Sequence, residues 1–360
     1  MRKATILLLL LAMTTAFVAS PPTIDKVSIK NDLPFLVDFY KTRHMNPEIS
    51  LQEKETSKVL ATELKKIGFS VTENFGGYGI VGVLKNGNGP TILYRTDMDG
   101  LPMHEKTELA YQSQLKAKLN GEEVGTMHSC GHDIHMTTWL GTARAMVGMK
   151  DKWKGTLLLI GQPAEEIGAG AKMMLEAGLY QKFGVPNYGL GLHSSPTLPA
   201  GKVGIGKGFV MASSESVDIN VYGVGSHGAS PQMSIDPIVV SSMLIMELQT
   251  IVSRNLKPTE SAVVTVGYLK GGSARNIIPD MVTLQLTIRT FKEEVRDMVN
   301  KRIKEIARGV GVAAGLPDDK MPEVIINAAG PANYNNPAVA ERIIKSATSV
   351  IGKENVVDEE

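Results

Sequence analysis

The stretch Pro90-Thr-Ile-Leu-Tyr-Arg-Thr-Asp-Met-Asp99 joins a short apolar run to a polar cluster. Short apolar runs of the same kind recur at 79–84, 155–160 and 188–192. Segments with helical spacing of apolar residues surround them, at 31–68, 136–149 and 171–177. Strands that alternate with helices predict a three-layer α/β domain with a mainly parallel sheet.

Polar clusters follow three of these predicted strands. They are Thr96-Asp-Met-Asp99, Gln162-Pro-Ala-Glu-Glu166 and His193. In open α/β sheets, ligands bind beyond the carboxyl ends of the strands. We therefore expect the functional site at this edge of the sheet.

A second domain is predicted after Lys202, because 360 residues exceed what one core usually supports. Period-two alternation there indicates four strands, at 203–206, 215–222, 261–269 and 282–289. Helical spacing indicates two helices, at 237–255 and 293–309. This pattern predicts a smaller α+β domain. The expected organisation is a main domain that begins at 21–201, an inserted domain at 202–315, and a return to the main domain at 316–360.

The first twenty residues have the pattern of a secretory signal peptide. Arg2 and Lys3 precede an apolar core at 6–12, and the stretch 16–20 contains the small residues Ala16, Ala19 and Ser20. An uncleaved anchor is the alternative, because Pro21 and Pro22 would directly follow a cut after residue 20. We expect a periplasmic or secreted protein. A single cysteine excludes an internal disulfide, so its thiol is free to bind a metal.

The charge balance argues against large anionic partners. The chain has 38 basic and 37 acidic residues, which gives a formal net charge of +1. Such a chain has no strong field to attract nucleic acid or a membrane surface. A small polar substrate is therefore expected, with no membrane contact beyond the signal segment.

The stretch Met127-His-Ser-Cys-Gly-His-Asp-Ile-His135 has the composition of a metal site. It places the only cysteine among three histidines and an aspartate. Thiolate, imidazole and carboxylate groups bind zinc-like divalent ions. The spacing of Cys130 and His132 allows a turn to direct both side chains at one point.

Four strings together resemble a known family. They are Tyr94-Arg-Thr-Asp-Met-Asp-Gly-Leu-Pro102, Met127-His-Ser-Cys-Gly-His-Asp133, Gln162-Pro-Ala-Glu-Glu166 and Gly191-Leu-His193. Strings of this kind, in this order, resemble those of the dinuclear-metal amidohydrolases, which include hippurate hydrolases, N-acyl-amino-acid amidohydrolases and auxin-conjugate hydrolases. The resemblance extends from about residue 31 to the end of the chain. It implies hydrolysis of the amide bond of N-acyl or N-aroyl amino acids.

The resemblance implies a metal site that holds two divalent ions per subunit. Its ligands would be Cys130, His132, Glu166 and His193, with the thiolate shared between the ions. A shared thiolate places negative charge between two cations that otherwise repel. Zinc suits these ligands, and nickel, cobalt or manganese could occupy similar sites.

The same resemblance gives catalytic roles to Glu165 and Asp99. Glu165 would be the general base on a metal-bridging water and would later deliver a proton to the leaving amine. Asp99 would orient an imidazole ligand. Adjacent side chains on an extended segment point in opposite directions. We therefore expect Glu165 to face the substrate while Glu166 faces the metal.

The inserted domain resembles the family's lid, which also forms the interface of a homodimer. His227, in Gly225-Ser-His-Gly-Ala229, would reach the partner's active site and stabilise the oxyanion. Asn276 and Arg289 would hold the substrate's carboxylate. These three residues are predicted to bind substrate.

The chain departs from the family pattern at its end. The family has a further C-terminal segment followed by a last histidine, whereas the last histidine here is His227. We expect either an incomplete chain or one weakly held ion. Two other functions stay open. A carboxypeptidase or dipeptidase could use the same metal centre with a different acyl pocket, and the absent last histidine leaves open a metal-binding dimer without turnover. Motif spacing does not distinguish aryl, alkyl and indolyl substrates.

Overall fold

The computed structural model describes residues 26–327 and 330–358. The predicted signal peptide, residues 1–20, lies outside the described residues. Internal contacts divide the chain into two compact units, Met1–Ser194 and Ser195–Glu360. Among the described helices, none has the length and apolar character needed to cross a membrane.

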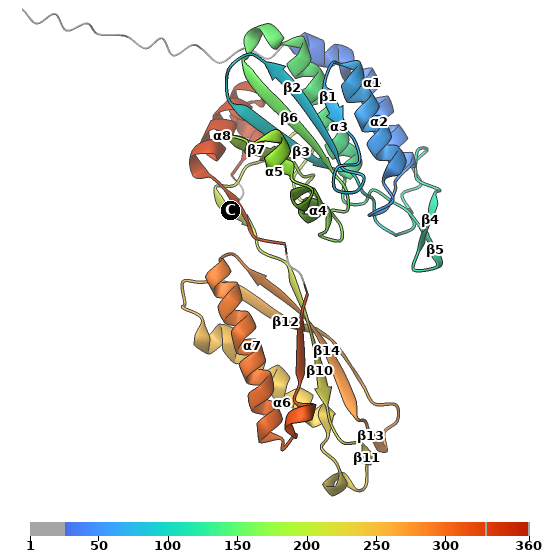
Figure 1. Ribbon diagram of the computed structural model, residues 1–360, viewed down its shortest axis with the longest axis vertical. Coiled ribbons are helices and arrows are strands. Elements are labelled where there is room, and N and C mark those ends of the chain that lie inside the picture. The colour runs from blue at the N-terminus through green and yellow to red at the C-terminus, as the bar shows by residue number, and fades with distance from the viewer. Residues whose placement is uncertain (1–25, 328–329, 359–360) are drawn as a thin grey trace, which may run out of the picture. The chain divides into compact units, whose positions relative to one another are not determined.

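The first unit is built on a five-stranded sheet with the order β1-β2-β6-β3-β7 (Figure 1). The strands are β1 (Ser70–Thr72), β2 (Ile80–Asn86), β3 (Thr91–Asp97), β6 (Gly155–Gln162) and β7 (Tyr188–Gly191). β3 pairs in parallel with both β6 and β7, whereas β2 pairs antiparallel with β1 and β6. The predicted α/β class is confirmed, but the sheet is mixed rather than mainly parallel.

The mixed sheet arises because β6 lies between β2 and β3, which are neighbours in sequence. A tight connection at 87–90 reverses the chain, yet the two strands do not pair with each other. Gly155, at the start of β6, has a φ of +130°. A Cβ atom there would lie 2.3 Å from the Pro90 carbonyl oxygen. Glycine at 155 therefore allows β6 to enter directly beside the turn.

Helices cover both faces of this sheet. One core packs α1 (Lys26–Met45), α2 (Lys54–Lys66) and α3 (His132–Gly148) on one face, around the fully buried Trp139 and Leu60. A smaller core packs α4 (Gly170–Glu176) and α5 (Leu179–Phe183) on the other face. A hairpin of β4 (Lys116–Leu119) and β5 (Glu122–Gly125) and a 3₁₀ turn, η1 (Lys150–Lys152), complete the unit. The predicted three-layer arrangement is therefore present.

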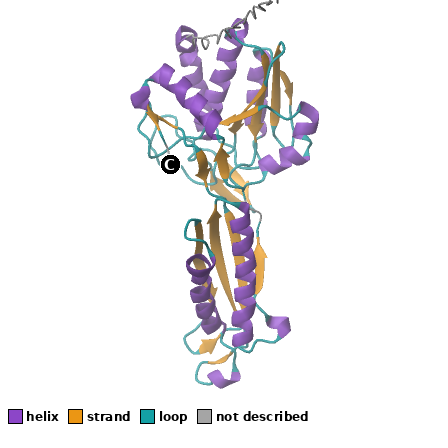
Figure 2. Ribbon diagram, turned by 90° about the vertical axis from the view of Figure 1, so that its left-hand side faces the viewer, coloured by secondary structure: helices purple, strands orange, loops and turns teal. Residues whose placement is uncertain are grey.

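The second unit contains a four-stranded antiparallel sheet (Figure 2). Its order is β12 (Ala262–Gly271), β14 (Met281–Thr290), β10 (Glu215–Tyr222) and β15 (Glu323–Ile326). Two helices, α6 (Pro237–Thr250) and α7 (Glu293–Ala313), pack on the sheet around an apolar core. A π-helical turn, η3 (Ile251–Asn255), continues α6. Three of the four predicted strands and both predicted helices are found here. The strand predicted at 203–206 lies outside this sheet, and β15 takes the fourth place instead.

Further elements complete the second unit. Three small strand pairs are present: β11 (Ser226–His227) with β13 (Ile277–Ile278), β8 (Val203–Gly204) with β17 (Val356–Val357), and β9 (Gly208–Met211) with β16 (Asn333–Asn335). The helical elements are α8 (Pro337–Ile351), η2 (Pro231–Met233), η4 (Asp318–Lys320) and η5 (Lys353–Asn355). Because β15 pairs with β10, the four-stranded sheet extends beyond the predicted boundary at residue 315.

Candidate metal centre

The carboxyl ends of three parallel strands define the candidate site in the first unit. β3, β6 and β7 run in the same direction, and the polar clusters predicted from sequence follow their last residues. Asp99 comes after β3, Glu165 and Glu166 come after β6, and His193 comes after β7. The fourth contribution is the start of α3, where His132 is the first helical residue.

His132 lies at the centre of this group and is fully buried. Its Nε2 atom lies 3.6 Å from Glu166 Oε1 and 3.7 Å from Glu165 Oε2. Its Nδ1 atom lies 3.4 Å from Asp99 Oδ1. Gly131 precedes it with a φ of +82°, and a Cβ atom there would lie 2.4 Å from the Ser194 hydroxyl. Glycine at 131 favours the left-handed turn that delivers His132 here.

Cys130 and His193 complete the group on its more exposed side. The Cys130 sulfur lies 3.4 Å from His193 Nε2. His193 Nδ1 lies 2.7 Å from the Ser194 carbonyl oxygen, to which a protonated Nδ1 donates. That hydrogen bond leaves the Nε2 lone pair directed toward the sulfur. One ligand atom each of Cys130, His132 and His193 lies within 4.8 Å of the others.

The buried atoms of this group fit a bound cation. Among the described residues, no hydrogen-bond partner is present for either ring nitrogen of His132 or for Glu166 Oε1. Buried polar atoms are nearly always paired. His132 Nδ1 faces Asp99, so the two atoms left for a cation are His132 Nε2 and Glu166 Oε1. His132, Glu165 and Glu166 also have ligand atoms within 4.8 Å of one another. The donor set of thiol, imidazole and carboxylate is one that binds divalent ions.

A third group of possible ligands, Asp97, His132 and His135, fits a cation less well. His135 Nδ1 lies 2.7 Å from Asp97 Oδ1, and His135 Nε2 accepts the Ser194 backbone N–H at 2.7 Å. Both ring nitrogens of His135 are therefore already engaged. These two contacts of His135 connect α3 to β3 and to Ser194.

Electrostatics show an excess of negative charge in the group. Burial, together with the carboxylates of Glu166 and Glu165, raises the pKa of Cys130 to about 12. Burial lowers the pKa of His132, but Asp99 and Asp97 outweigh this effect and raise it above its ordinary value. A cation bound among these groups would offset their mutual repulsion and favour the thiolate.

Glu165 and Glu166 do not point in opposite directions, so that expectation was wrong. Their carboxylates both approach His132 Nε2, because residues 165–168 form a turn rather than an extended segment. The Gly168 N–H donates to the Glu165 carbonyl oxygen at 2.8 Å and closes the turn. The two side chains differ in exposure instead: 35% for Glu165 and 15% for Glu166.

Asp99 contacts both the histidine and the glutamate loop. Its two carboxylate oxygens accept the backbone N–H groups of Glu165 at 3.1 Å and Glu166 at 3.0 Å. The Ser50 hydroxyl also donates to Asp99 at 2.6 Å. Burial alone would raise the pKa of Asp99. The interactions with His132 and with these donors outweigh burial, so the pKa lies below its ordinary value. The charged carboxylate lies 3.4 Å from His132 Nδ1, and its role in orienting that ring stays a prediction.

Sequence reasoning missed several buried partners. Besides the Asp97–His135 pair, His44 lies between Asp133 and Glu105, with nitrogen–oxygen distances of 2.6 and 3.0 Å. These partners are 89 and 61 residues from His44 in the chain. Spacing gives no signal for pairs so far apart. For Asp97 and His135 a signal existed, because both stand inside the quoted strings.

The predicted substrate-binding residues lie in the second unit. Pairing of β11 with β13 places His227 opposite Ile277, and the Gly228 N–H donates to the Asn276 carbonyl oxygen at 2.8 Å. His227 and Asn276 are thus neighbours. Arg289 stands near the other end of β14 and donates to the Ser214 hydroxyl at 2.7 Å. The structure therefore does not group Arg289 with the other two.

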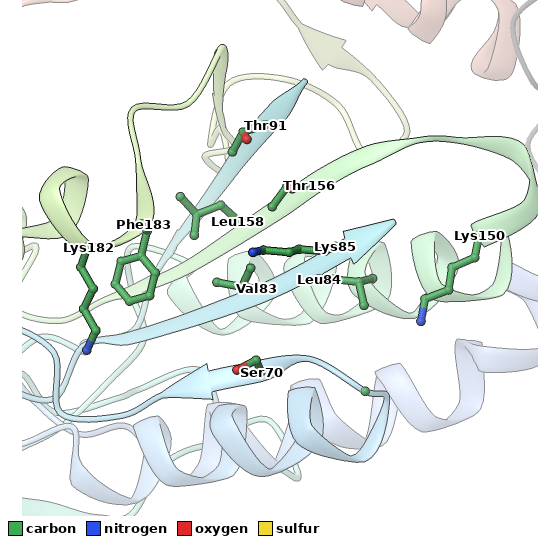
Figure 3. Close-up of a pocket in the computed structure, with 11 residues that line it drawn as sticks. Ser70, Val83, Leu84, Lys85, Thr91, Lys150, Thr156, Leu158, Lys182 and Phe183 are labelled. Atoms are coloured by element: carbon green, nitrogen blue, oxygen red, sulfur yellow. The ribbon is translucent and has the colours of Figure 1, made fainter. Parts of the chain in front are cut away.

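A hollow of about 740 Å³ lies at the opposite end of the first unit's sheet (Figure 3). Its lining includes Thr91 and Thr156, near the amino ends of β3 and β6. The candidate metal site instead follows the carboxyl ends of those strands. None of the predicted site residues lines this hollow.

Comparisons with known proteins show which family the chain is similar to. The sequence profile of the peptidase family M20/M25/M40 matches residues 93–360. Hippurate hydrolase of Campylobacter jejuni is 38% identical over 333 residues, which cover 90% of this chain and 83% of that protein. Thermostable carboxypeptidase 2 of Saccharolobus solfataricus is 35% identical, with 89% of this chain and 80% of the relative covered.

A solved structure is similar as well. A dinuclear metal-binding peptidase of the M20 family from Bacillus subtilis superposes with a TM-score of 0.74 and 30% identity. The match covers 93% of this chain and 83% of that one. The roles of the individual side chains stay predictions. The matched profile and the identity to these relatives show that the chain belongs to the peptidase family M20/M25/M40 and is a metal-dependent amidohydrolase.

Proposed function

We propose that this enzyme hydrolyses the amide bond of N-acyl and N-aroyl amino acids, with N-benzoylglycine as the leading substrate. The observation that carries the proposal is the similarity to a hippurate hydrolase over 90% of the chain. The expected products are a carboxylic acid and a free amino acid. The formal net charge of +1 is compatible with such a small anionic substrate.

Four side chains would hold two divalent ions: Cys130, His132, Glu166 and His193. Supporting this assignment, Glu166 Oε1 and His132 Nε2 are buried without a hydrogen-bond partner among the residues described. When bound, divalent ions would polarise the amide carbonyl and make a water molecule more acidic. Zinc is the first choice for these donors, with nickel, cobalt and manganese as alternatives.

Glu165 would carry out the proton transfers. Its carboxylate is more exposed than that of Glu166, so substrate can reach it. It would take one proton from the attacking water as the new carbon–oxygen bond forms. It would then give that proton to the amide nitrogen as the carbon–nitrogen bond breaks. Asp99 would keep His132 oriented during both steps.

Hydrolysis of N-benzoylglycine, measured together with metal content, tests the proposal. The purified chain is loaded with zinc, manganese, cobalt or nickel, and its metal content is determined by elemental analysis. Release of glycine in a metal-dependent manner is the expected result. A chain that binds metal but does not cleave the substrate at high enzyme concentration would contradict it.

A carboxypeptidase or dipeptidase activity is the second candidate. The similarity to the Saccharolobus solfataricus carboxypeptidase favours it, because 89% of this chain is covered. Both activities would use the same metal centre, so side-by-side kcat/KM values for N-benzoylglycine and simple dipeptides separate them. A clear preference for dipeptides would replace the first proposal.

We also infer that the enzyme forms a homodimer through its second unit. The exposed side chains of Val239, Met243 and Met246 follow one another at four- and three-residue intervals on α6. β12 stands at the edge of its sheet and carries exposed Val263 and Leu269. An apolar helix face beside an unpaired strand edge is suited to contact a second copy.

A further inference from the structure

Glu53 is a buried carboxylate that the proposed reaction does not use. It lies just before α2 and is fully buried. Its Oε1 atom accepts two backbone N–H groups, from Leu51 at 3.0 Å and from Ala164 at 2.7 Å. Ala164 directly precedes Glu165 although it is 111 residues from Glu53 in the chain. Glu53 thus contacts the glutamate loop from a distant segment.

Both residues that Glu53 binds have unusual backbones. Leu51 has a φ of +66° and Ala164 has a φ of +47°. Residues with a side chain rarely adopt this left-handed conformation, because it brings the Cβ atom too close to a carbonyl oxygen. Such a conformation persists where surrounding contacts enforce it. The Glu53 carboxylate supplies one such contact to each residue.

Glu53 and Asp99 together hold three consecutive N–H groups of the loop. Glu53 accepts from Ala164, and Asp99 accepts from Glu165 and Glu166. The fold of the loop is also fixed at Gly170, where a Cβ atom would lie 1.5 Å from the Pro163 carbonyl oxygen. The directions of the two glutamate side chains therefore depend on how Ala164 is held.

Capping of α2 does not explain Glu53. The side chain of Glu53 makes no capping hydrogen bond to its own helix. Glu48 caps α2 instead. Its carboxylate accepts the N–H groups of Glu55 and Thr56 at 3.1 and 2.7 Å. The Glu53 side chain is turned toward the loop at 164 rather than toward α2.

We propose that Glu53 is a positioning residue, whose buried Oε1 atom fixes the left-handed conformation of Ala164 and thereby aims Glu165 and Glu166 into the metal site. The kinetic part of this proposal rests on the proposed function. The structural part does not, because it concerns only the loop. Glu53 contacts no reacting atom, so it acts through Ala164.

Two variants separate the hydrogen bond from the volume of the side chain. Glu53→Met keeps the length of the side chain and removes the acceptor. Glu53→Gln keeps the acceptor, because its amide oxygen can receive the same two N–H groups. Burial raises the pKa of Glu53 to about 7, so an uncharged amide is a fair substitute for the protonated carboxyl. Glu55→Met is the matched control, because Glu55 is exposed.

The first measurement is amide hydrogen exchange of the full chain, followed by mass spectrometry of peptides that contain residues 163–170. In Glu53→Met we expect exchange of the Ala164 amide at least about tenfold faster than in the parent, since its acceptor is lost. Glu53→Gln and Glu55→Met should stay within about twofold of the parent. Unchanged exchange in Glu53→Met would overturn the proposal, whatever the substrate is.

The second measurement is steady-state hydrolysis of N-benzoylglycine by metal-loaded protein. Misplacement of a catalytic group by about 1 Å can cost on the order of 100-fold, so kcat of Glu53→Met should fall 10- to 100-fold. KM should change less than about threefold, because Glu53 does not contact the substrate. Glu53→Gln should recover most of kcat. A Glu53→Gln variant as impaired as Glu53→Met would refute the hydrogen-bond explanation.

Discussion

Adjacent glutamates have different surroundings at the candidate metal centre. The Glu166 carboxylate is the less exposed of the two and has an oxygen without a hydrogen-bond partner within the described chain. The Glu165 carboxylate is more open to solvent. Because both lie beside His132, position alone does not separate their roles. The lower exposure of Glu166 and its unpaired oxygen favour it as the metal ligand. The greater exposure of Glu165 favours it as the general base.

Replacement of Glu165 should separate catalysis from metal binding. In Glu165→Gln we expect kcat to fall by about 10²- to 10⁴-fold, the usual contribution of a general base. Bound metal should stay at the parent level, as measured by elemental analysis of the same samples. The matched change, Glu166→Gln, should lower metal content instead. Loss of metal in Glu165→Gln would reverse the two assignments.

Replacement of the only cysteine should remove metal and activity together. We expect Cys130→Ala to bind less metal because its sulfur is one of three ligand atoms within 4.8 Å of one another. Turnover of N-benzoylglycine should be lost in parallel. If Cys130→Ala keeps its full metal content, the sulfur is not a ligand.

At the scale of elements, three buried side chains connect α1 to the start of α3. His44, near the end of α1, lies 2.6 Å from Asp133 on α3 and 3.0 Å from Glu105. All three side chains are at most 8% exposed. Burial lowers the pKa of His44, but its hydrogen bonds to Glu105 and Asp133 outweigh this effect and raise it above the ordinary value.

This contact predicts a pH-dependent stability of the first unit. Because the folded state binds the His44 proton more tightly, the contribution is complete below the ordinary histidine pKa of about 6.5. It should be lost as pH rises through the higher folded-state value. We expect His44→Phe to reduce the free energy of unfolding by about 3–5 kcal/mol at pH 6, as for other broken buried ion pairs, and by less at pH 9.

Tryptophan fluorescence in urea measures this effect in metal-free protein. Both tryptophans, Trp139 and Trp153, belong to the first unit, so the signal reports that unit. A variant that is destabilised equally at both pH values would show that the charge on His44 is unimportant.

Most elements could be predicted from apolar spacing, because their patterns are local. The strands expected at 155–160 and 215–222 are β6 (Gly155–Gln162) and β10 (Glu215–Tyr222). The short β1 and the β4–β5 hairpin were not predicted, because their residues are largely polar and half-exposed or exposed. The order of the strands within the sheet could not be predicted from the sequence either. Nothing in the local pattern shows that β6 separates β2 from β3.

The candidate site was predictable to the extent that its residues stand in recognisable strings. Cys130, His132, Glu166 and His193 were named from such strings, and the structure brings them together. Glu53 and His44 could not be found this way. Ala164 is 111 residues from Glu53, and Glu105 and Asp133 are 61 and 89 residues from His44. Only folding brings these residues together.

At the scale of the whole molecule, association should depend on α6. We expect the parent chain to be a dimer by light scattering. Met246→Glu should shift it toward monomer, because Met246 is 71% exposed in the apolar face of α6 and a charge there would be costly to bury. Val312→Glu on α7 is the control, since Val312 is 58% exposed but outside that face. A monomeric parent would remove the proposed interface.

The carboxylates around Cys130 have a further consequence for the metal-free protein. They and burial raise the pKa of its thiol to about 12, so without a cation the sulfur is a neutral, weakly nucleophilic group. Oxidation and disulfide exchange proceed through the thiolate. A chain with one cysteine would otherwise risk sulfenic acid formation or covalent pairing with a second chain wherever conditions are oxidising. The two glutamates proposed to bind the ions and to transfer protons should therefore also protect the thiol of the metal-free protein.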